Sequence, residues 1–456
     1  MKATMDTTPG TSVRKVLVWT ALLAVLTLPA SRAFAQLTTV HLNQIGRYES
    51  GIFAQGGAEI VAHDPASQRL FVVNAQAATV DVLDISNPAA PTLAFTIDVT
   101  PFGAVANSVS AKKRTVAVAV ENANKQANGK VVFFDTDGNY LSDVTVGALP
   151  DMVTFTPNGK WVLVANEGEP SADYSVDPEG SISVIDVSKG VANVSQADVR
   201  TAGFGAFNST TLDPSIRIFG PGATVAQDLE PEFITVSKDS RIAWVTLQEN
   251  NALAIVDIRH AKVRKLTGLG FKDHTAPGNG FDASNRDDTI NISNWPTKGM
   301  YQPDAIASFR FIHKTYLITA NEGDARDYDG FSEETRVKDL ILDPVAFPDA
   351  ATLQEDENLG RLKTTTANGD TDNDGDVDEI YSYGARSFSI WDDRGKQIFD
   401  SGDALEQITA AAYPNDFNSD DEENDSFDNR SDDKGQEPEG VVVGRNHFPK
   451  YAFIGL

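Results

Sequence analysis

Short runs of Val, Ile, Phe and Thr recur along the chain after residue 36, separated by clusters of Gly, Asn, Asp and Pro. Their length and composition are typical of β-strands, and helical periodicity is scarce. Five times, a run that ends in Asn, Glu or Gln-Glu is followed by a second run that ends in Asp. The five copies lie at 71–85, 118–135, 162–186, 245–258 and, in two pieces, 317–323 with 385–392. Such repetition predicts an architecture built from one repeated β-unit.

The repeated unit contains two further runs. An opening strand follows a Pro or Gly turn, as at 150–156, 231–237 and 303–309, and a more polar strand follows the recurrent Asp, as at 92–99 and 141–147. Four strands in about 45 residues are typical of a propeller blade. The sequence therefore predicts an all-β fold, a β-propeller of the WD40 or YVTN type. The recurrent Asp residues are expected to start the turn to the fourth strand; they are Asp84, Asp135, Asp186, Asp257 and Asp392.

A sixth unit begins at 438–444 and continues through 450–456, where the sequence stops in an expected second strand. A closed ring that ended there would expose an unpaired strand edge. We therefore expect the chain to be truncated at its C-terminus. The whole protein is expected to have at least six blades, with seven as our prediction.

The N-terminus has the pattern of a secretory signal peptide. Lys2, Arg14 and Lys15 precede the apolar stretch 16–28, and an A-x-A cleavage site ends at Ala35. A membrane anchor is the alternative, although the apolar stretch is short for a membrane span. We predict a signal peptide over 1–35, a propeller domain over 36–456 and a secreted, periplasmic or cell-surface location. The chain contains no cysteine, which excludes disulfides, thiolate metal sites and cysteine nucleophiles.

The formal net charge of −27 argues against nucleic-acid binding and is unevenly distributed. Residues 370–379 hold six acids and no base, and residues 416–439 hold eleven acids and two bases. Without these contributions of −6 and −9 the net charge is −12. The acidity is thus concentrated in two inserts, 323–385 and 415–437. This distribution suggests cation binding or a high-salt environment outside the cell.

Carboxylates recur at two places in the unit. The second strand runs antiparallel to the first, so the start of strand one and the end of strand two share one mouth of the propeller. Acids open the first strands, with Asn107 in the second unit: Glu59, Asp151, Glu232, Asp304 and Glu439. The second strands end in Asn74, Glu121, Glu167, Glu249 and Glu322. Carboxylates so gathered repel one another without a cation, and oxygen ligands suit calcium first and magnesium or manganese next. Solvated strand caps are the alternative.

The longest insert contains a calcium-loop pattern. Its acids follow the D-x-D-x-D-G spacing of an EF-hand at positions one, three, five, seven and nine: Asp370, Asp372, Asp374, Asp376 and Asp378. Gly375 permits the sharp turn, but position twelve is Tyr381 instead of a bidentate Glu. The pattern predicts an EF-hand-like or dockerin-like calcium loop, with a solvated acidic loop as the alternative. The second insert lacks this spacing, and we expect a flexible acidic segment or a cation-linked one.

Catalytic patterns are weaker. No G-x-S-x-G, H-E-x-x-H or P-loop motif is present, and no nucleophile is assigned. The densest mixed cluster, 321–327, places Glu322 and Asp324 beside Arg326. Such a group could hold a metal and an anionic oxygen together, as phosphoryl hydrolysis requires. Arg326 and Arg386 are the candidate phosphate contacts. The alternative is that Arg326 neutralises its acidic neighbours.

Four segments, 165–186, 318–340, 374–392 and 435–444, resemble the choice-of-anchor I family. They read ANEGEPSADYSVDPEGSISVID, ITANEGDARDYDGFSEETRVKDL, DGDVDEIYSYGARSFSIWD and GQEPEGVVVG. The resemblance covers roughly 40–456. It implies a seven-bladed, secreted or surface-associated propeller, and the family includes alkaline-phosphatase-like and mesenchyme-specific cell-surface glycoprotein-like proteins. It also implies that Glu167, Glu322, Asp324, Arg326 and Glu439 belong to the characteristic mouth.

Two functions fit these observations. In the first, calcium or another divalent cation at the mouth polarises a phosphate ester and activates water, so that the protein is a metal-dependent phosphatase. In the second, calcium stabilises a non-catalytic cell-surface or extracellular module that binds matrix or mineral. No further segment of the mature chain is apolar and long enough to cross a membrane.

Overall fold

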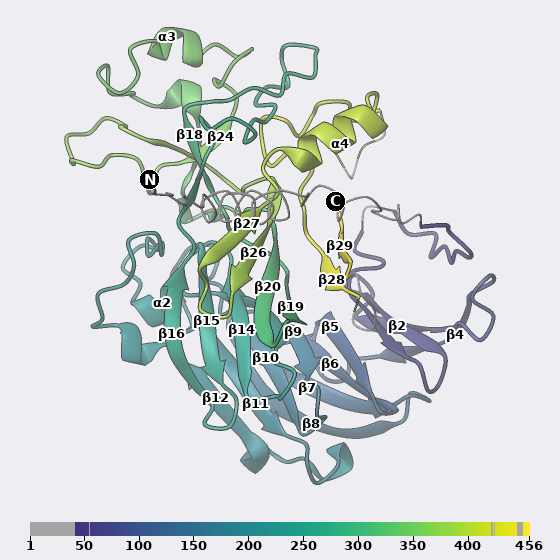
Figure 1. Ribbon diagram of the computed structural model, residues 1–456. Helices are drawn as coiled ribbons and strands as arrows, with labels where there is room; N and C mark the ends of the chain where they lie inside the picture. Colours follow the sequence, from purple (N-terminus) through teal and green to yellow (C-terminus); the bar gives the residue numbers. More distant parts are fainter. Residues whose placement is uncertain (1–41, 54, 421–422, 424, 445–449) are drawn as a thin grey trace, which may run out of the picture. The chain divides into compact units, whose positions relative to one another are not determined.

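The computed structural model of the protein describes residues 42–53, 55–420, 423, 425–444 and 450–456. Residues Gly46–Leu456 pack as one unit, to which all contacts described below belong. In the described part of this unit, five sheets have four antiparallel strands each, and one of the two-stranded sheets completes the set of six blades. Each four-stranded sheet keeps its strands in chain order, from the first to the last (Figure 1).

The six sheets are the blades predicted from the repeat, numbered here in chain order. The first blade consists of β1 (Val61–Asp64), β2 (Arg69–Asn74), β3 (Thr79–Asp84) and β4 (Thr92–Asp98). The second consists of β5 (Val105–Lys112), β6 (Thr115–Glu121), β7 (Asn128–Asp135) and β8 (Tyr140–Ala148). The third consists of β9 (Pro150–Phe155), β10 (Trp161–Asn166), β11 (Ser181–Asp186) and β12 (Val199–Gly203).

The remaining blades contain longer insertions. The fourth consists of β13 (Pro231–Val236), β14 (Ile242–Leu247), β15 (Ala252–Asp257) and β16 (Lys262–Gly268). The fifth consists of β19 (Ile306–Phe311), β20 (Lys314–Asn321), β26 (Ser387–Asp392) and β27 (Gln397–Asp400). The sixth consists of β28 (Val441–Val443) and β29 (Ala452–Ile454).

The recurrent Asp residues make the turns between third and fourth strands, as predicted. Asp135 accepts hydrogen bonds at Oδ1 from the backbone N–H groups of Asp137 and Asn139, both at 2.9 Å. Asp186 does the same for Ser188 at 2.9 Å. Side-chain to backbone bonds of this kind mimic a turn and stop the strand.

Alternation along each strand places the hydrophobic core between blades. On β6, Val116, Val118 and Val120 pack into a cluster shared with the first blade. The intervening Ala117 and Ala119 pack into a cluster shared with the third blade. Since both faces of β6 are buried, its sequence is almost continuously apolar. Equivalent clusters join the third blade to the fourth and the fourth to the fifth.

The first strands of successive blades contact one another in the order β1, β5, β9, β13, β19 and β28. Sheets that follow one another face to face, with their first strands side by side, form the β-propeller that the repeat predicted. Seven blades in the whole protein stay a prediction. No helix in the described residues is both long and apolar enough to cross a membrane.

Two long insertions build a separate sheet that the repeat did not predict. It contains β17 (Phe271–Asp273), β18 (Thr297–Met300), β25 (Ile380–Ser382), β24 (Lys363–Thr365) and β23 (Glu334–Arg336). Strands β18 and β25 pair in parallel, and a buried cluster around Phe281, Leu359 and Leu362 supports the sheet. The labels β18 and β24 mark it in Figure 1. The short helix α3 (Ala350–Leu353) belongs to the second of these insertions, whereas α4 (Ala404–Ala412) lies between β27 and β28.

The described part of the acidic insert 415–437 makes ion pairs with the five-stranded sheet, and whether the insert also binds a cation stays a prediction. Asp432 is buried and accepts from Arg336 at 2.6 Å and Arg361 at 3.0 Å. Lys363 of β24 bonds Asp433 at 3.0 Å. Partly buried ion pairs therefore fix this insert to the five-stranded sheet, and the pairing accounts for part of its acidity.

Candidate metal site

Three of the polar residues that open first strands lie at β-bulges. The ladder between β5 and β6 skips Asn107, and that between β9 and β10 skips Asp151. Between β13 and β14 the register shifts at Glu232. A bulge redirects the side chain it carries, so these three residues occupy equivalent positions in consecutive blades. In these three blades the polar group at the start of strand one is therefore positioned by the same irregularity of the backbone.

At the end of strand two, the Asn and the Glu of the recurrent Asn-Glu pair have different roles. Asn166 is buried and donates to the Ser181 and Ser183 hydroxyls at 3.2 and 3.0 Å. Asn321 makes the corresponding bonds to Ser387 and Ser389 of the fifth blade, at 3.1 and 2.8 Å. The Asn thus fastens strand two to strand three, which leaves the following Glu to face the mouth.

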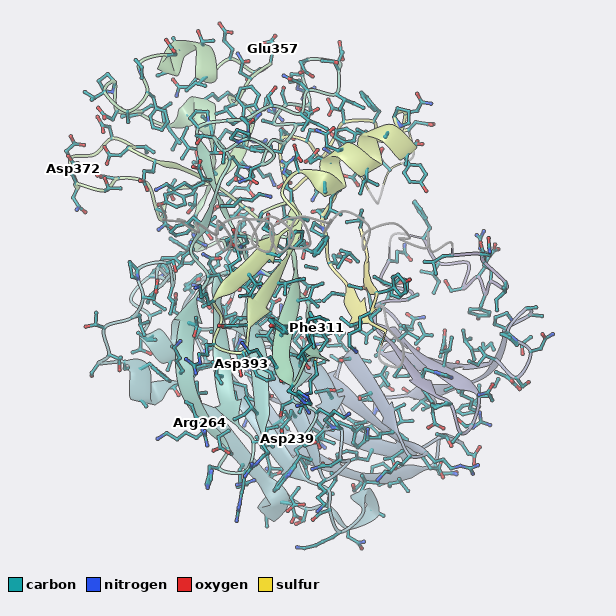
Figure 2. All side chains as sticks on the ribbon, viewed as in Figure 1. Asp239, Arg264, Phe311, Glu357, Asp372 and Asp393 are labelled. Carbon is teal, nitrogen blue, oxygen red and sulfur yellow. The ribbon has the colours of Figure 1, made fainter. Side chains whose placement is uncertain are left out.

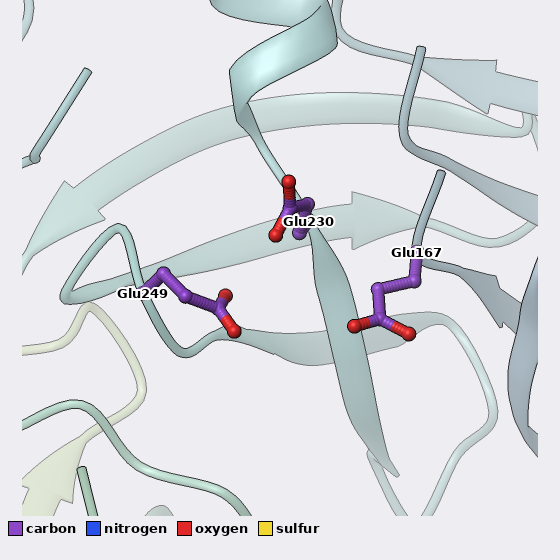
Figure 3. A group of neighbouring side chains, drawn as sticks. All are labelled: Glu167, Glu230 and Glu249. Atoms are coloured by element: carbon purple, nitrogen blue, oxygen red, sulfur yellow. The ribbon is translucent and has the colours of Figure 1, made fainter. Parts of the chain in front are cut away.

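Three glutamates from two neighbouring blades converge at this mouth. Glu167 follows β10, Glu230 precedes β13, and Glu249 follows β14. One carboxylate oxygen from each lies within 4.8 Å of the others, and the three groups face a common space (Figure 3). Oxygens bound to one calcium at about 2.4 Å lie at most about 4.8 Å apart. We call Glu167, Glu230 and Glu249 the glutamate triad.

The triad is buried and incompletely hydrogen-bonded. Its residues are 9%, 1% and 5% exposed in chain order, and the Oε2 atoms of Glu230 and Glu249 have no hydrogen-bond partner in the described structure. Burial raises the pKa of Glu167 and Glu249 well above the usual range, and neighbouring carboxylates raise it further. Burial also raises the pKa of Glu230 to about 8, although Arg326 opposes this shift. Buried carboxylates without partners are costly, and a bound cation would relieve that cost.

Arg326, a predicted phosphate contact, is already paired beside the triad. It bonds Asp228 at 2.5 Å and Glu230 at 3.0 Å, and its side chain is 1% exposed. The guanidinium also lies 4.6 Å from the ring centroid of Phe219. Asp228 ends helix α2 (Val225–Asp228). Arg326 therefore neutralises buried acids, but these are Asp228 and Glu230 instead of the sequence neighbours Glu322 and Asp324.

Two insertions join next to the triad. The backbone N–H of Gly330 donates to the Ala172 carbonyl at 2.7 Å. The Tyr174 ring makes edge contacts with Tyr328 and Phe331, at 5.5 and 5.6 Å between centroids. Burial raises the pKa of Tyr328, and the nearby carboxylates of the triad add to this shift. These contacts connect the insertion 168–180 to the hairpin of β21 (Asp327–Tyr328) and β22 (Phe331–Ser332).

The other predicted mouth acids differ in their surroundings. Asp151, Glu232 and Asp304 form the inner set. Burial raises the pKa of Asp151 to about 7 and raises those of Glu232 and Asp304 well above the usual range. Glu322 is paired with Lys434 at 2.6 Å and accepts from Gln248 at 3.1 Å. The remaining predicted ligands at this mouth have exposed side chains: Glu59, Asp324 and Glu439.

The predicted calcium loop brings three of its acids together at the surface. Asp370, Asp372 and Asp374 each place a carboxylate oxygen within 4.8 Å of the others, and all three are exposed. Asp372 is labelled in Figure 2, within the insert. Asp378 instead accepts from the Thr371 N–H and hydroxyl at 2.7 and 2.6 Å, and Asp376 is a surface residue. Calcium binding by this loop stays a prediction.

Arg386, the second predicted phosphate contact, holds the 415–437 insert. Its Nη1 atom donates to the Asp282 carbonyl at 2.7 Å and to Glu406 at 3.0 Å. Its Nη2 atom donates to the carbonyls of Ser431 and Asp433 at 2.7 and 2.8 Å. The side chain is buried, so this arginine anchors the insert and has both terminal nitrogens occupied by protein oxygens.

Glu230 was not among the predicted ligands; the prediction named Glu232, two residues later. A signal was available, because Glu230 precedes the proline that opens a first strand. The residues in the same place before Pro150 and Pro303 are Leu149 and Gln302. This position is therefore acidic in some units only, so the repeat pattern does not mark it.

The family model of the choice-of-anchor I domain matches residues 59–456. The chain belongs to the choice-of-anchor I family. This match confirms the resemblance of its four long motifs, and it covers all six blades and both acidic inserts. Membership of this family and the propeller fold together indicate an extracellular or cell-surface β-propeller.

Individual relatives share only part of the chain. Gigasin-3a of Magallana gigas is 38% identical over 108 residues, which span 23% of this chain and 38% of that protein. A chain of a nidogen/laminin complex matches 46% of this chain and 62% of its own, with 12% identity and a TM-score of 0.29. Hydrazine synthase of Kuenenia stuttgartiensis matches 58% of this chain and 80% of its own, with 14% identity and a TM-score of 0.30.

Proposed function

We propose that this protein is an exported, calcium-binding β-propeller in which the glutamate triad holds the cation. The observation that carries the proposal is the convergence of three buried carboxylates, two of which have an Oε2 atom without a hydrogen-bond partner. Oxygen-only surroundings suit hard cations, calcium first. Arg326 offsets part of the negative charge through Asp228 and Glu230, which leaves Glu167 and Glu249 for the cation to neutralise.

The expected role of the cation is to stabilise the mouth. Glu167 and Glu249 belong to different blades, and the segments beside them carry the Tyr174 and Tyr328 contacts. A cation bound by both glutamates would therefore couple the third blade, the fourth blade and the joined insertions. This geometry favours the non-catalytic, calcium-stabilised extracellular module.

Phosphate-ester hydrolysis remains a prediction, and neither of the two arginines predicted to contact phosphate is free to support it. Arg326 and Arg386 are both buried in ion pairs with protein carboxylates, whereas a phosphate contact needs donors that reach the substrate. Turnover of a phosphate ester that requires calcium and is lost in Glu249→Gln would favour the enzyme. Negligible turnover, with and without chelation, would favour the binding module.

Isothermal titration of calcium into the chelator-treated protein tests the proposal. The wild type is expected to bind calcium saturably, and Glu249→Gln is expected to lose the triad component of that binding. Glu357→Gln is the matched control, because Glu357 is an exposed glutamate of the insert (Figure 2). Unchanged calcium binding by Glu249→Gln would refute a cation site at the triad.

A further inference from the structure

The end of the blades opposite the triad contains a cavity of about 450 Å³. The first strands start at the acidic mouth, so their C-terminal ends meet at the other face. Val236 at the end of β13, Phe309 of β19 and Val443 at the end of β28 all line the cavity. Its size lies within the range of about 300–1,000 Å³ that is typical of small-molecule sites.

The polar lining of this cavity is cationic. Lys238, Arg310 and Lys450 contribute to the lining, and none of the lining residues is an acid. This is unusual for a chain with a net charge of −27. Among the described residues, these three cations have no carboxylate partner within ion-pair distance. Arg310 makes only a 3.2 Å bond to the His313 carbonyl through Nη2. Cationic groups without acidic partners attract an external anion.

Uncharged polar groups and apolar walls complete the cavity. Asn158, Ser308 and Thr315 line it together with Pro157 and the three apolar residues named above. The Ser308 hydroxyl is already used, since it donates to the Val236 carbonyl at 3.1 Å. Asn158 and Thr315 are therefore the neutral groups best suited to an anionic head, and Phe309 and Val443 suit an apolar body.

We propose that this basic cavity binds a small organic phosphate monoester, with the phosphate among Lys238, Arg310 and Lys450. A group of several cations suits a doubly charged phosphate better than a singly charged carboxylate. Arginine can also contact a phosphate with two donors. The site lies at the end of the first strands remote from the glutamate triad and contains none of its residues. Binding here is therefore independent of the calcium site.

Titration with phenylphosphonate tests this proposal, because its C–P bond resists hydrolysis. The full chain is used with EDTA, which leaves the triad without calcium. Saturable binding is expected, tighter than that of inorganic phosphate and weaker as ionic strength rises, since salt screens charges beyond about 8–10 Å. Lys238→Glu is expected to weaken binding roughly tenfold or more, because attraction becomes repulsion.

Lys262→Glu is the matched control for Lys238→Glu. Lys262 is exposed and begins β16, which belongs to the same blade as Lys238. It should bind phenylphosphonate like the wild type. Calcium titration of Lys238→Glu reports whether the variant keeps its fold, and Lys238→Gln gives a milder change if it does not. No saturable binding, or equal binding by the wild type and a folded Lys238 variant, would overturn the proposal. Inorganic phosphate binding as tightly as phenylphosphonate would contradict the apolar subsite.

Discussion

The glutamate triad and the 370–378 loop are both groups of three converging carboxylates, but they differ in burial. The triad is enclosed, and two of its oxygens have no partner. The loop is exposed, and backbone N–H groups of Asp374 and Gly375 donate to Asp370. Water and the backbone can therefore satisfy the loop without a cation, whereas in the triad Arg326 pairs with Glu230 alone and two buried oxygens stay without a partner. A similar arrangement of charge thus has different energetic consequences at the two places.

Replacement of Arg326, the cationic side chain beside the triad, should have the largest effect on stability. Arg326→Met leaves Asp228 and Glu230 buried without their partner, and we expect unfolding to become easier by about 3–5 kcal/mol. Lys338→Met is the control, since the Lys338–Asp356 pair is partly exposed and should contribute about 0–1 kcal/mol. Chemical denaturation measures both. Equal effects of the two substitutions would contradict the expectation that the buried ion pairs stabilise the fold more than the partly exposed one.

Calcium bound at the triad should raise the free energy of unfolding more than calcium bound at exposed acids. With free calcium at 100 times Kd, the wild type is expected to gain about 2.7 kcal/mol in unfolding free energy. Glu249→Gln should lose this gain without destabilising the calcium-free protein, because glutamine replaces a buried carboxylate that lacks a partner on Oε2. Thermal unfolding with calcium and with EDTA checks both expectations. A variant that is destabilised equally in the two conditions would indicate a structural glutamate instead of a ligand.

Burial of His274 should make the stability of the protein depend on pH. Its Nδ1 lies 2.7 Å from the Asn279 carbonyl, and burial, followed by the charge of Lys272, lowers its pKa to about 3. Since the unfolded histidine binds a proton below about pH 6.5, stability is lost as pH falls from 6.5 towards 3. The expected loss at pH 5 is about 2 kcal/mol. His274→Asn should flatten this part of the stability profile. Parallel profiles for the wild type and His274→Asn would contradict the prediction.

Substitution in the loop should have the smallest effect. Asp372→Asn is expected to change the calcium-free stability by less than about 0.5 kcal/mol, as is usual at the surface. If the loop binds calcium as its sequence predicts, calcium binding that remains in Glu249→Gln should disappear in the double variant. Calorimetric stoichiometry separates the two sites. Identical stoichiometry with and without Asp372→Asn would leave the loop a solvated acidic turn.

The blades were predictable because the information for them is local and repeated. The alternation that places Val118 and Ala119 on opposite faces of β6 is visible in the sequence, as are the turns at Asp135 and Asp186. The five-stranded insert sheet was not predictable in this way. Its parallel pair joins Thr297 to Ile380, and no repeat marks strands that are so far apart in the chain.

The triad was predictable only in part. Glu167 and Glu249 end second strands in the repeat, whereas Glu230 lies before a proline at a position that is Leu149 in the preceding blade. The partner of Arg326 could not be read from its acidic neighbours Glu322 and Asp324. Asp228 lies 98 residues away in sequence, and only the fold brings the two together.

A crystal structure of the calcium-loaded protein, with anomalous diffraction to locate the ion, most directly tests whether the triad is a cation site. We predict a peak within about 2.3–2.6 Å of oxygens from Glu167, Glu230 and Glu249. A fully calcium-saturated crystal with no peak among these three carboxylates would contradict the central proposal, whatever is found at the 370–378 loop.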